Sequence, residues 1–409
     1  MRGRGRWALA VALALAMAAL AGLCVQQAVV ERLAGSDPKT ALGWSPNSAE
    51  ALAWAADDAA QQAKTGADFE YAAQLAKRAL SSTPLQPRAL RVLAWVAEND
   101  GRVAEARRLM ALAGSLTQRD NRIHGWLLND RLNRNDYAAA MQSADAVLRR
   151  DQDLGEAFYP SINARLAEAD ARRAVVDRLV FGPDWRRDFL SYESRHLPDT
   201  GTLVALFREL HARSPLSPEE ASWLVGRLVD EGQYRVARSV WTELLPPRHA
   251  SPGLLYDAEF AGRPGAPPFN WKFVDGSEAI SGIAEAPDGS RGLHVQFPLG
   301  RSERLVEQLL VLPAGTYRLA AQVSSEDPQK GERLVWKVEC VTNADTPLLT
   351  LLHEARGPAW LLLRGDFTVP PTACPAQRIS LWNLAEDGFG VAQAWYRGLM
   401  LAPQSGEPR

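Results

Sequence analysis

The chain lacks an excess of charge of either sign, because 46 Lys and Arg stand against 48 Asp and Glu over 409 residues. This balance excludes a protein that binds nucleic acid or another polyanion through bulk positive charge. Charged residues make up 23% and hydrophobic residues 46%, an ordinary globular composition that excludes wholesale disorder. The length predicts two or three domains, each large enough to bury a core.

Motifs for known catalytic chemistry are also absent from the sequence. The six histidines are scattered and none lies in a His-Glu-x-x-His spacing, so a zincin site is unsupported. There is no Gly-x-Ser-x-Gly elbow and no Gly-rich phosphate loop ending in Lys-Ser/Thr. Two facing carboxylates from separate segments would leave no such signature, so a polysaccharide-modifying enzyme stays an alternative. We expect no catalytic residue, no metal site and no cofactor.

The amino terminus combines Arg2, Arg4 and Arg6 with an uncharged run from Trp7 to Val25. At about 1.5 Å per residue, a helix of this length matches the roughly 30 Å hydrocarbon core of a membrane. Arginines before the span predict that this end stays in the cytoplasm and that the rest is exported. We expect a signal anchor over 1–30, and the alternative is a signal peptide cleaved after Ala21.

Cysteine is scarce, with one residue, Cys24, in the apolar run and two, Cys340 and Cys374, in the part expected to be exported. Such an even pair outside the cytoplasm predicts a disulfide. Two unrelated buried thiols are the alternative. A metal site is less well supported, because no further Cys or His stands near the pair at ligand spacing.

Residues 45–248 follow a period of thirty-four residues, in which small side chains recur at fixed positions. These positions are Ala72, Ala106 and Ala140, and in a second row Ala79, Ala113 and Val147. The spacing resembles tetratricopeptide repeats (TPR), closely over 49–150 and more weakly afterwards. The resemblance implies an all-α array of antiparallel helix pairs that binds protein segments on its concave face. Candidate groove residues are Trp95, Trp126 and Tyr137, which are alternatively packed between helices.

Beyond the breaker-rich segment at Pro246 and Pro247, the helical period gives way to short alternating runs. These runs predict an all-β antiparallel sandwich over 253–403. The predicted strands are Gly292 to Phe297, Leu305 to Leu312, Gly315 to Ser324, Arg333 to Val341, Trp360 to Val369, Gln377 to Asn383 and Ala394 to Leu401.

The order of motifs in this β-rich part resembles jelly-roll carbohydrate-binding modules of the galactose-binding-like kind. The segments that carry the resemblance are Gly292-Leu293-His294-Val295, Pro313-Ala314-Gly315-Thr316-Tyr317-Arg318-Leu319 and Phe367-Thr368-Val369-Pro370. The closing strand of such modules usually carries Tyr-x-Asp, whereas this chain has Trp395-Tyr396-Arg397, which weighs against the calcium that they often bind. Modules of this kind stack sugar rings on exposed aromatic side chains. The ligand-binding candidates are Trp360, Trp382, Asn383, Phe389 and Trp395.

The whole layout, including the stretch Trp44-Ser45-Pro46-Asn47-Ser48-Ala49-Glu50-Ala51-Leu52, resembles membrane-anchored tetratricopeptide proteins encoded with bacterial exopolysaccharide machinery. The resemblance implies a non-catalytic scaffold, anchored by one span in the inner membrane with most of the chain in the periplasm. Its array would bind envelope proteins of a polysaccharide synthesis or export system, and its β module would bind polysaccharide or that machinery. The alternative is an envelope assembly factor that binds only protein.

Overall fold

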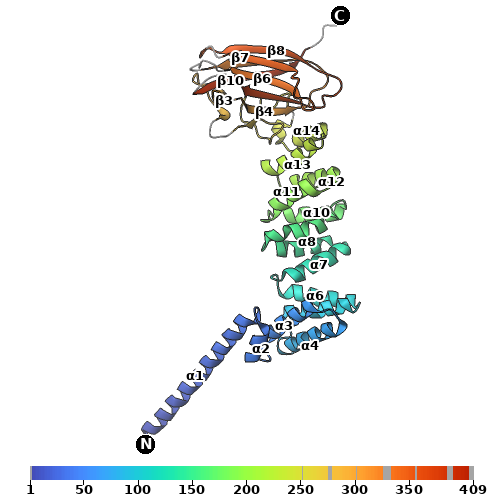
Figure 1. The fold of residues 1–409 in the computed structure, drawn as a ribbon, viewed down its shortest axis with the longest axis vertical. Coiled ribbons are helices and arrows are strands. Elements are labelled where there is room, and N and C mark those ends of the chain that lie inside the picture. The colour runs from blue at the N-terminus through green and yellow to red at the C-terminus, as the bar shows by residue number, and fades with distance from the viewer. Residues whose placement is uncertain are drawn as a thin grey trace. The chain divides into compact units, whose positions relative to one another are not determined.

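The computed structural model describes residues 2–250, 252–274, 279–300, 302–325, 333–354, 357–384 and 390–404, with side chains from Leu13 onward. The chain divides into two compact units, Met1–Trp185 and Arg186–Arg409. The first unit is helical, and the second contains further helices followed by two β-sheets (Figure 1). The predicted fold class, a helical array followed by an antiparallel sandwich, is confirmed.

The described part of the first unit consists of helices joined by short turns. The unit contains α1 (Arg2–Ala34), α2 (Pro38–Trp44), α3 (Ala49–Gln62), α4 (Gly66–Ser82), α5 (Pro87–Asn99), α6 (Val103–Leu116), α7 (Asn121–Asn133), α8 (Tyr137–Leu148), the 3-10 helix η1 (Gln152–Leu154), α9 (Gly155–Asn163) and α10 (Ala169–Leu179). Side-chain caps begin several of them. Thr65 and Asp68 form a capping box at the start of α4, for example, and Asp120 accepts from the first N–H groups of α7.

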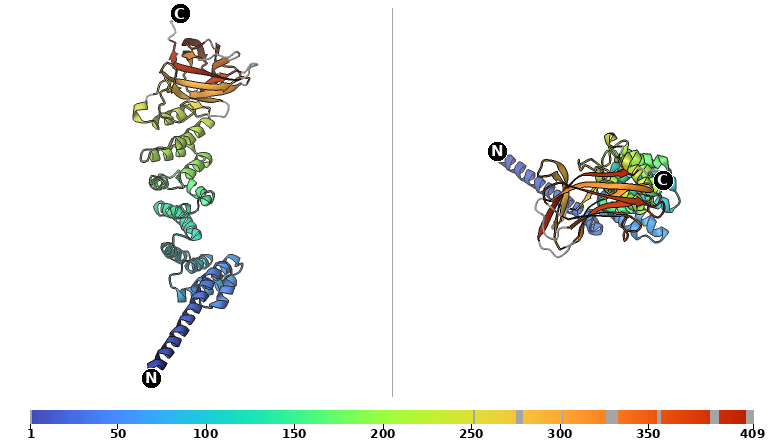
Figure 2. Two further views of the ribbon diagram at one scale, coloured as in Figure 1. Left: turned by 90° about the vertical axis from the view of Figure 1, so that its left-hand side faces the viewer. Right: turned by 90° about the horizontal axis from the view of Figure 1, so that it is seen from above.

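The small side chains of the thirty-four-residue period are the contact points between helices. All six positions, Ala72, Ala79, Ala106, Ala113, Ala140 and Val147, are at most 1% exposed. Small residues at these positions let the helices of a pair approach closely, which a larger side chain would prevent. Figure 2 shows these helices as a stack that follows the chain order within the first unit.

The amino-terminal helix α1 has two parts with different surroundings. The stretch Leu13–Ala34 is long and apolar enough to cross a membrane, and most of it is not covered by the rest of the chain. Its last turns are different, because Val30 and Ala34 are fully buried against Ala41 and Ala51 of α2 and α3. The helix is therefore continuous with the array that follows it.

The second unit begins with four helices and a short 3-10 helix: α11 (Arg186–His196), α12 (Thr200–His211), α13 (Pro218–Asp230), α14 (Tyr234–Glu243) and η2 (Pro247–His249). Helix α14 packs on the sandwich through Trp241, whose indole N–H donates to the carbonyl of Ala266 at 2.7 Å. Its ring meets Tyr256 edge-on at 4.8 Å between centroids. Burial beside this contact lowers the pKa of Arg238 to about 10. The last helix and the sandwich thus share one core.

Two five-stranded antiparallel sheets face each other in the sandwich. Sheet A has the order β1 (Lys272–Phe273), β4 (Glu303–Leu310), β9 (Gln377–Asn383), β6 (Arg333–Cys340) and β7 (Leu349–Glu354). Sheet B has the order β2 (Ile280–Glu285), β3 (Arg291–Pro298), β10 (Val391–Pro403), β5 (Gly315–Ser324) and β8 (Leu361–Val369). From β4 on, the chain passes repeatedly from one sheet to the other, as in a jelly roll.

Large aromatic side chains fill the space between the sheets. Trp336 of β6 is fully buried and meets Tyr396 of β10 edge-on at 5.6 Å between centroids. Trp271 is also buried and donates its indole N–H to the carbonyl of Asp257. Cys340 and Cys374 form the predicted disulfide at the edge of this core. A loop closed over 34 residues stabilises the module by about 3–4 kcal/mol in the chain-entropy model.

Candidate functional site

The outer face of sheet B carries the polar and aromatic side chains of the candidate site. Successive side chains of a strand point to opposite faces of its sheet. Leu293, Val295, Ala394 and Tyr396 lie in the core, so the residues between them point outward. We call this surface the Trp395 face and define it by His294 and Gln296 of β3, Gln322 of β5, and Gln393, Trp395 and Arg397 of β10.

An aromatic pair lies at the centre of the Trp395 face. Trp395 and His294 are partners in the register of β10 and β3, and their ring centroids are 4.3 Å apart. Trp395 is 8% exposed, and within the described part of the chain its buried indole N–H has no acceptor. Burial lowers the pKa of His294, while its contact with the side-chain oxygen of Gln393 acts in the opposite direction. His294 is therefore a neutral group at neutral pH.

Arg397 organises the neighbouring corner of the same face. Its guanidinium donates to Asp288, to the hydroxyl of Ser290 and to the amide oxygen of Gln322, each at 2.8 Å. It also lies over the ring of Trp360, 3.9 Å from the centroid, and the Trp360 indole N–H donates to Asp288 at 2.8 Å. The turn between β2 and β3 and the segment before β8 are thereby tied to the centre of β10.

Hydrogen bonds keep the carboxylate of this corner charged. The hydroxyl and N–H of Ser290, then the Trp360 indole, and then the charge of Arg397 hold the pKa of Asp288 well below its usual range. The ion pair of Asp288 with Arg397 leaves the corner without net charge. Among the described residues, no group of three or more His, Cys, Asp and Glu is placed to hold a metal ion.

This arrangement suits a neutral ligand rich in hydroxyl groups. The amides of Gln296, Gln322 and Gln393 offer both donors and acceptors, and the Trp395 indole adds a donor that no acceptor within the described part of the sandwich satisfies. Aromatic rings next to such groups match a ligand with apolar ring faces and polar edges, as a pyranose has.

The ligand-binding candidates that the sequence suggested lie in different parts of the sandwich. Trp395 lies on the Trp395 face, and Trp360 lies beside that face, in contact with Arg397. Trp382 belongs to β9 of sheet A, where Arg304 and Lys337 lie 5.4 and 5.0 Å from its ring centroid. These two cations compete with any sugar for the ring. Asn383 is fully buried and donates to the carbonyl of Pro298, so it lines neither outer face. Phe389 lies outside the described residues.

The three aromatic residues proposed for a groove in the array make contacts within it. The Trp95 ring lies 5.2 Å from the guanidinium carbon of Arg91, and the Trp126 indole N–H donates to Glu98. Tyr137 is 6% exposed and its hydroxyl donates to Asn135 and Glu168. Tyr137 thus packs inside the array, the alternative that the sequence left open.

Sequence reasoning missed His294, Gln393 and Gln322, and it treated Arg397 only as a departure from a motif. A signal for them was present, because strands Gly292 to Phe297 and Ala394 to Leu401 were predicted and alternate positions must share a face. What the pattern lacked was the register that places His294 opposite Trp395 and Trp395 opposite Ser324.

Comparisons with known proteins give partial similarities of fold. No family model and no curated protein matches the sequence. Among solved structures, a family 4 carbohydrate-binding module is 15% identical with a TM-score of 0.29, and the match covers 37% of this chain and 99% of that module. A family 61 module in complex with β-1,4-galactotriose is 18% identical with a TM-score of 0.26, covering 38% and 100%. A family 22 module of Clostridium thermocellum is 15% identical with a TM-score of 0.28, covering 37% and 96%.

Proposed function

We propose that this protein is a non-catalytic scaffold of the bacterial envelope that binds polysaccharide on the Trp395 face. The observation that carries the proposal is the buried indole N–H of Trp395, which lacks an acceptor among the described residues and lies on a face that also carries three glutamine amides, His294 and Arg397. A buried donor without a partner costs free energy unless a ligand or water satisfies it. A sugar hydroxyl or ring oxygen would accept from this indole while the glutamine amides bind neighbouring hydroxyls.

We propose that the protein acts in the periplasm at the inner membrane. The process it serves would be the biosynthesis or export of exopolysaccharide or capsule. The apolar stretch of α1 supports an anchor, and the disulfide supports an oxidising compartment. Tethering at the membrane raises the effective concentration of partners near the site of synthesis. The array would hold protein partners of that machinery, and the sandwich would hold the polymer.

A binding experiment tests the sugar site. We would titrate the full-length chain in detergent with xylo-oligosaccharides, β-1,4-galacto-oligosaccharides and an array of envelope glycans. Gln393→Ala should weaken binding roughly tenfold, because a ligand hydrogen bond of about 1–1.5 kcal/mol is lost. Arg397→Ala should weaken it by a similar factor, because the Gln322 amide loses the donor that orients it. Trp382→Ala is the matched control on sheet A and should bind as the wild type does.

Three results would contradict the proposal. Absence of binding to every glycan would favour a factor that binds only protein. Loss of binding in Trp382→Ala, with Gln393→Ala unaffected, would move the site to sheet A. Release of shorter sugars from the titrated polymers would instead indicate an enzyme.

A further inference from the structure

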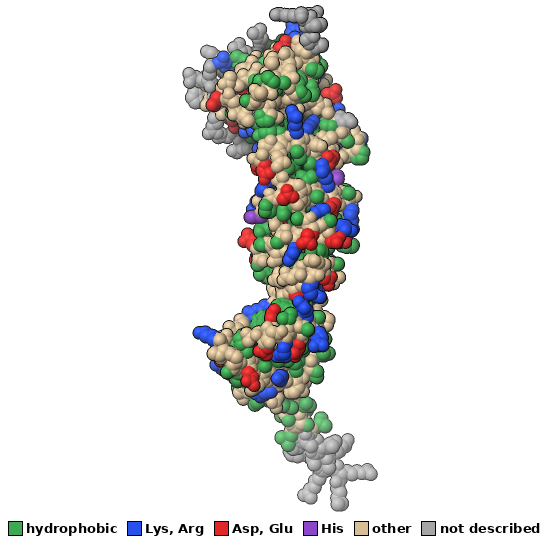
Figure 3. Space-filling view, turned by 90° about the vertical axis from the view of Figure 1, so that its right-hand side faces the viewer, with side chains coloured by type: hydrophobic (Ala, Val, Ile, Leu, Met, Phe, Trp, Pro, Cys, Tyr) green, Lys and Arg blue, Asp and Glu red, His purple; other side chains and the backbone are tan. Residues whose placement is uncertain are grey.

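A cavity of about 550 Å³ opens between α3, α5 and the start of α7 in the first unit. None of the aromatic residues proposed for a groove lines it. Its residues are Trp54, Asp57, Asp58, Gln61, Gln86, Pro87, Arg88, Arg91, Thr117, Arg119, Asp120, Asn121, Arg122 and Arg150. Five of these fourteen are arginines, in a chain whose charges otherwise balance. On the face of the helices that Figure 3 shows, acidic and basic side chains are interspersed.

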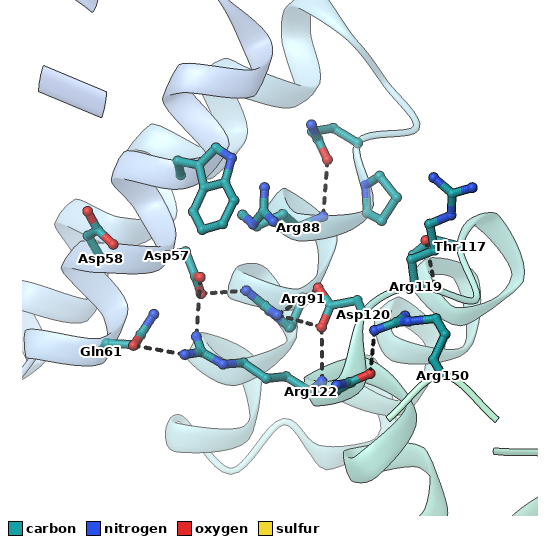
Figure 4. Close-up of a pocket in the computed structure, with 14 residues that line it drawn as sticks. Asp57, Asp58, Gln61, Arg88, Arg91, Thr117, Arg119, Asp120, Arg122 and Arg150 are labelled. Carbon is teal, nitrogen blue, oxygen red and sulfur yellow. Dashed lines mark hydrogen bonds and ion pairs between the residues drawn. The ribbon is translucent and has the colours of Figure 1, made fainter. Parts of the chain in front are cut away.

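The floor of the cavity is an ion network that is neutral in itself. Arg91 is 2% exposed and lies between two carboxylates, 2.6 Å from Asp57 and 2.7 Å from Asp120. Arg122 reaches across to Asp57 at 3.2 Å and to the amide oxygen of Gln61 at 3.1 Å (Figure 4). The charges of Arg91 and Arg122 thus balance those of Asp57 and Asp120, and both aspartates already form ion pairs.

The rim adds positive charge that no carboxylate neutralises. Within the described part of the chain, the guanidinium of Arg119 has no hydrogen-bond or ion-pair partner. Arg150 donates only to the carbonyl of Gln118 and to the amide oxygen of Asn121. Asp58 also lines the cavity, but Figure 4 shows it on the far side from Arg119 and Arg150. Helices α5 and α7 both begin here, which adds the positive ends of two helix dipoles.

The aromatic wall of the cavity is not open for stacking. The guanidinium carbon of Arg88 lies 3.3 Å from the ring centroid of Trp54, and the same group pairs with Glu50. Arg88 therefore already occupies the face of Trp54 that it covers, where a sugar ring would otherwise stack, whereas a carboxylate needs only guanidinium donors. A cavity of this volume accommodates a few residues of an extended chain.

We infer that this cavity binds an acidic peptide segment of a partner protein, with Arg119 and Arg150 receiving its carboxylates. Guanidinium groups bind carboxylates with two parallel hydrogen bonds, and both rim arginines are exposed and accessible to such a segment. The inference concerns the first unit alone and does not depend on the sugar site of the sandwich.

The test is binding of a fluorescein-labelled peptide of alternating Glu and Ser to the full-length chain, followed by fluorescence anisotropy. A matched peptide of alternating Gln and Ser and an oligomer of galacturonic acid are the comparison ligands. Arg119→Gln/Arg150→Gln should weaken binding of the acidic peptide about tenfold or more, and binding should fall as salt rises. Arg119→Gln alone should weaken it less, with little effect on folding because this side chain is exposed and its guanidinium has no hydrogen-bond or ion-pair partner among the described residues.

The matched control is Arg108→Gln/Arg173→Gln, which removes two exposed arginines outside the cavity. It should leave affinity for the acidic peptide within about twofold of the wild type. Equal loss in both double variants would indicate non-specific attraction and overturn the inference. So would equal binding of the Glu and Gln peptides, or binding of the galacturonate oligomer without the peptide.

Discussion

Arg397 shows how one side chain determines the chemistry of the Trp395 face. In an antiparallel sheet an arginine at this position would ordinarily extend into solvent. Here it contacts Asp288, Ser290, Gln322 and the ring of Trp360, so its charge is neutralised and its geometry is restrained by four partners. The face therefore presents oriented donors and acceptors without net charge, which is the property that a neutral ligand requires.

The protonation of His294 should make the sandwich sensitive to acid. The folded state holds this ring neutral with a lowered pKa, so the unfolded chain binds more protons between the folded pKa and the ordinary value of about 6.5. The contribution to the free energy of unfolding is complete above about pH 6.5 and is lost as the pH falls through the folded pKa. Urea denaturation of the wild type and of His294→Gln, at about pH 7.5 and at about pH 5, measures this contribution to the free energy of unfolding. The stability difference between the two proteins should shrink in acid, and a constant difference would contradict the argument.

Arg91 should be indispensable to the first unit, because it is the buried cation between Asp57 and Asp120. Arg91→Leu leaves two carboxylates without that partner and should lower the free energy of unfolding by about 3–5 kcal/mol. Arg108→Leu, at an exposed position of α6, is the control and should change it by less than about 0.5 kcal/mol. Helical circular dichroism during denaturation follows both variants. If Arg91→Leu is as stable as Arg108→Leu, the ion pairs of Arg91 with Asp57 and Asp120 do not contribute to the free energy of unfolding.

At the scale of elements, three of the described strands were missed by sequence patterns, and all three lie at sheet edges. β1 and β7 flank sheet A, and β2 flanks sheet B. An edge strand pairs on one side only, so its structure depends on the neighbour more than on its own residues. The central strands β5 and β9 were predicted with the bounds that they have, Gly315–Ser324 and Gln377–Asn383. Their alternation of core and outward residues is strong because both sides are paired.

The pairing of β3 with β10 in sheet B requires a glycine at position 292. A Cβ at this position would lie 2.4 Å from the carbonyl oxygen of Tyr396, on the neighbouring strand β10. Gly292→Ala should therefore force β3 and β10 apart and cost about 1–3 kcal/mol. Gly282→Ala on β2 is the control, because nothing lies within 4 Å of its Cβ position. Tryptophan fluorescence during denaturation gives the comparison, and equal stability of the two variants would argue against this register.

At the scale of the whole molecule, α1 joins the apolar stretch to the array without a break. Val30 and Ala34 are buried against Ala41 and Ala51, while the residues before them are largely uncovered. An anchor retained in the membrane would hold the array within a few residues of the lipid surface. A chain cleaved after Ala21 would still keep the buried turns of the helix.

Two truncations separate the parts played by this helix. A chain that begins at Gly22 keeps Val30 and Ala34, and its array should unfold at the same urea concentration as the full-length array. A chain that begins at Gly35 loses both contacts and should be less stable by about 2 kcal/mol, since a buried valine and an alanine are removed. Identical midpoints for the two truncations would show that these contacts contribute nothing. Intact-mass measurement of the exported protein distinguishes anchor from cleaved signal.

The sequence by itself determined the features that follow from local backbone periodicity. A helix repeats every 3.6 residues and a strand every two, so the apolar run, the thirty-four-residue array and the central strands could all be recognised from spacing. The pairing of Cys340 with Cys374 also followed, because those two were the only cysteines outside the apolar run.

Only the tertiary structure decided which distant side chains meet. Arg397 and Asp288 are 109 positions apart, and Arg122 and Asp57 are 65 apart. Neither strand register nor helix stacking can be read from a local pattern, because both depend on how loops close and how faces pack. For that reason Trp382 and Asn383 were grouped with Trp395 by their place in the sequence, whereas the sheets put them on a different layer. The arginine-rich cavity arises in the same way, from residues of several helices that share no motif.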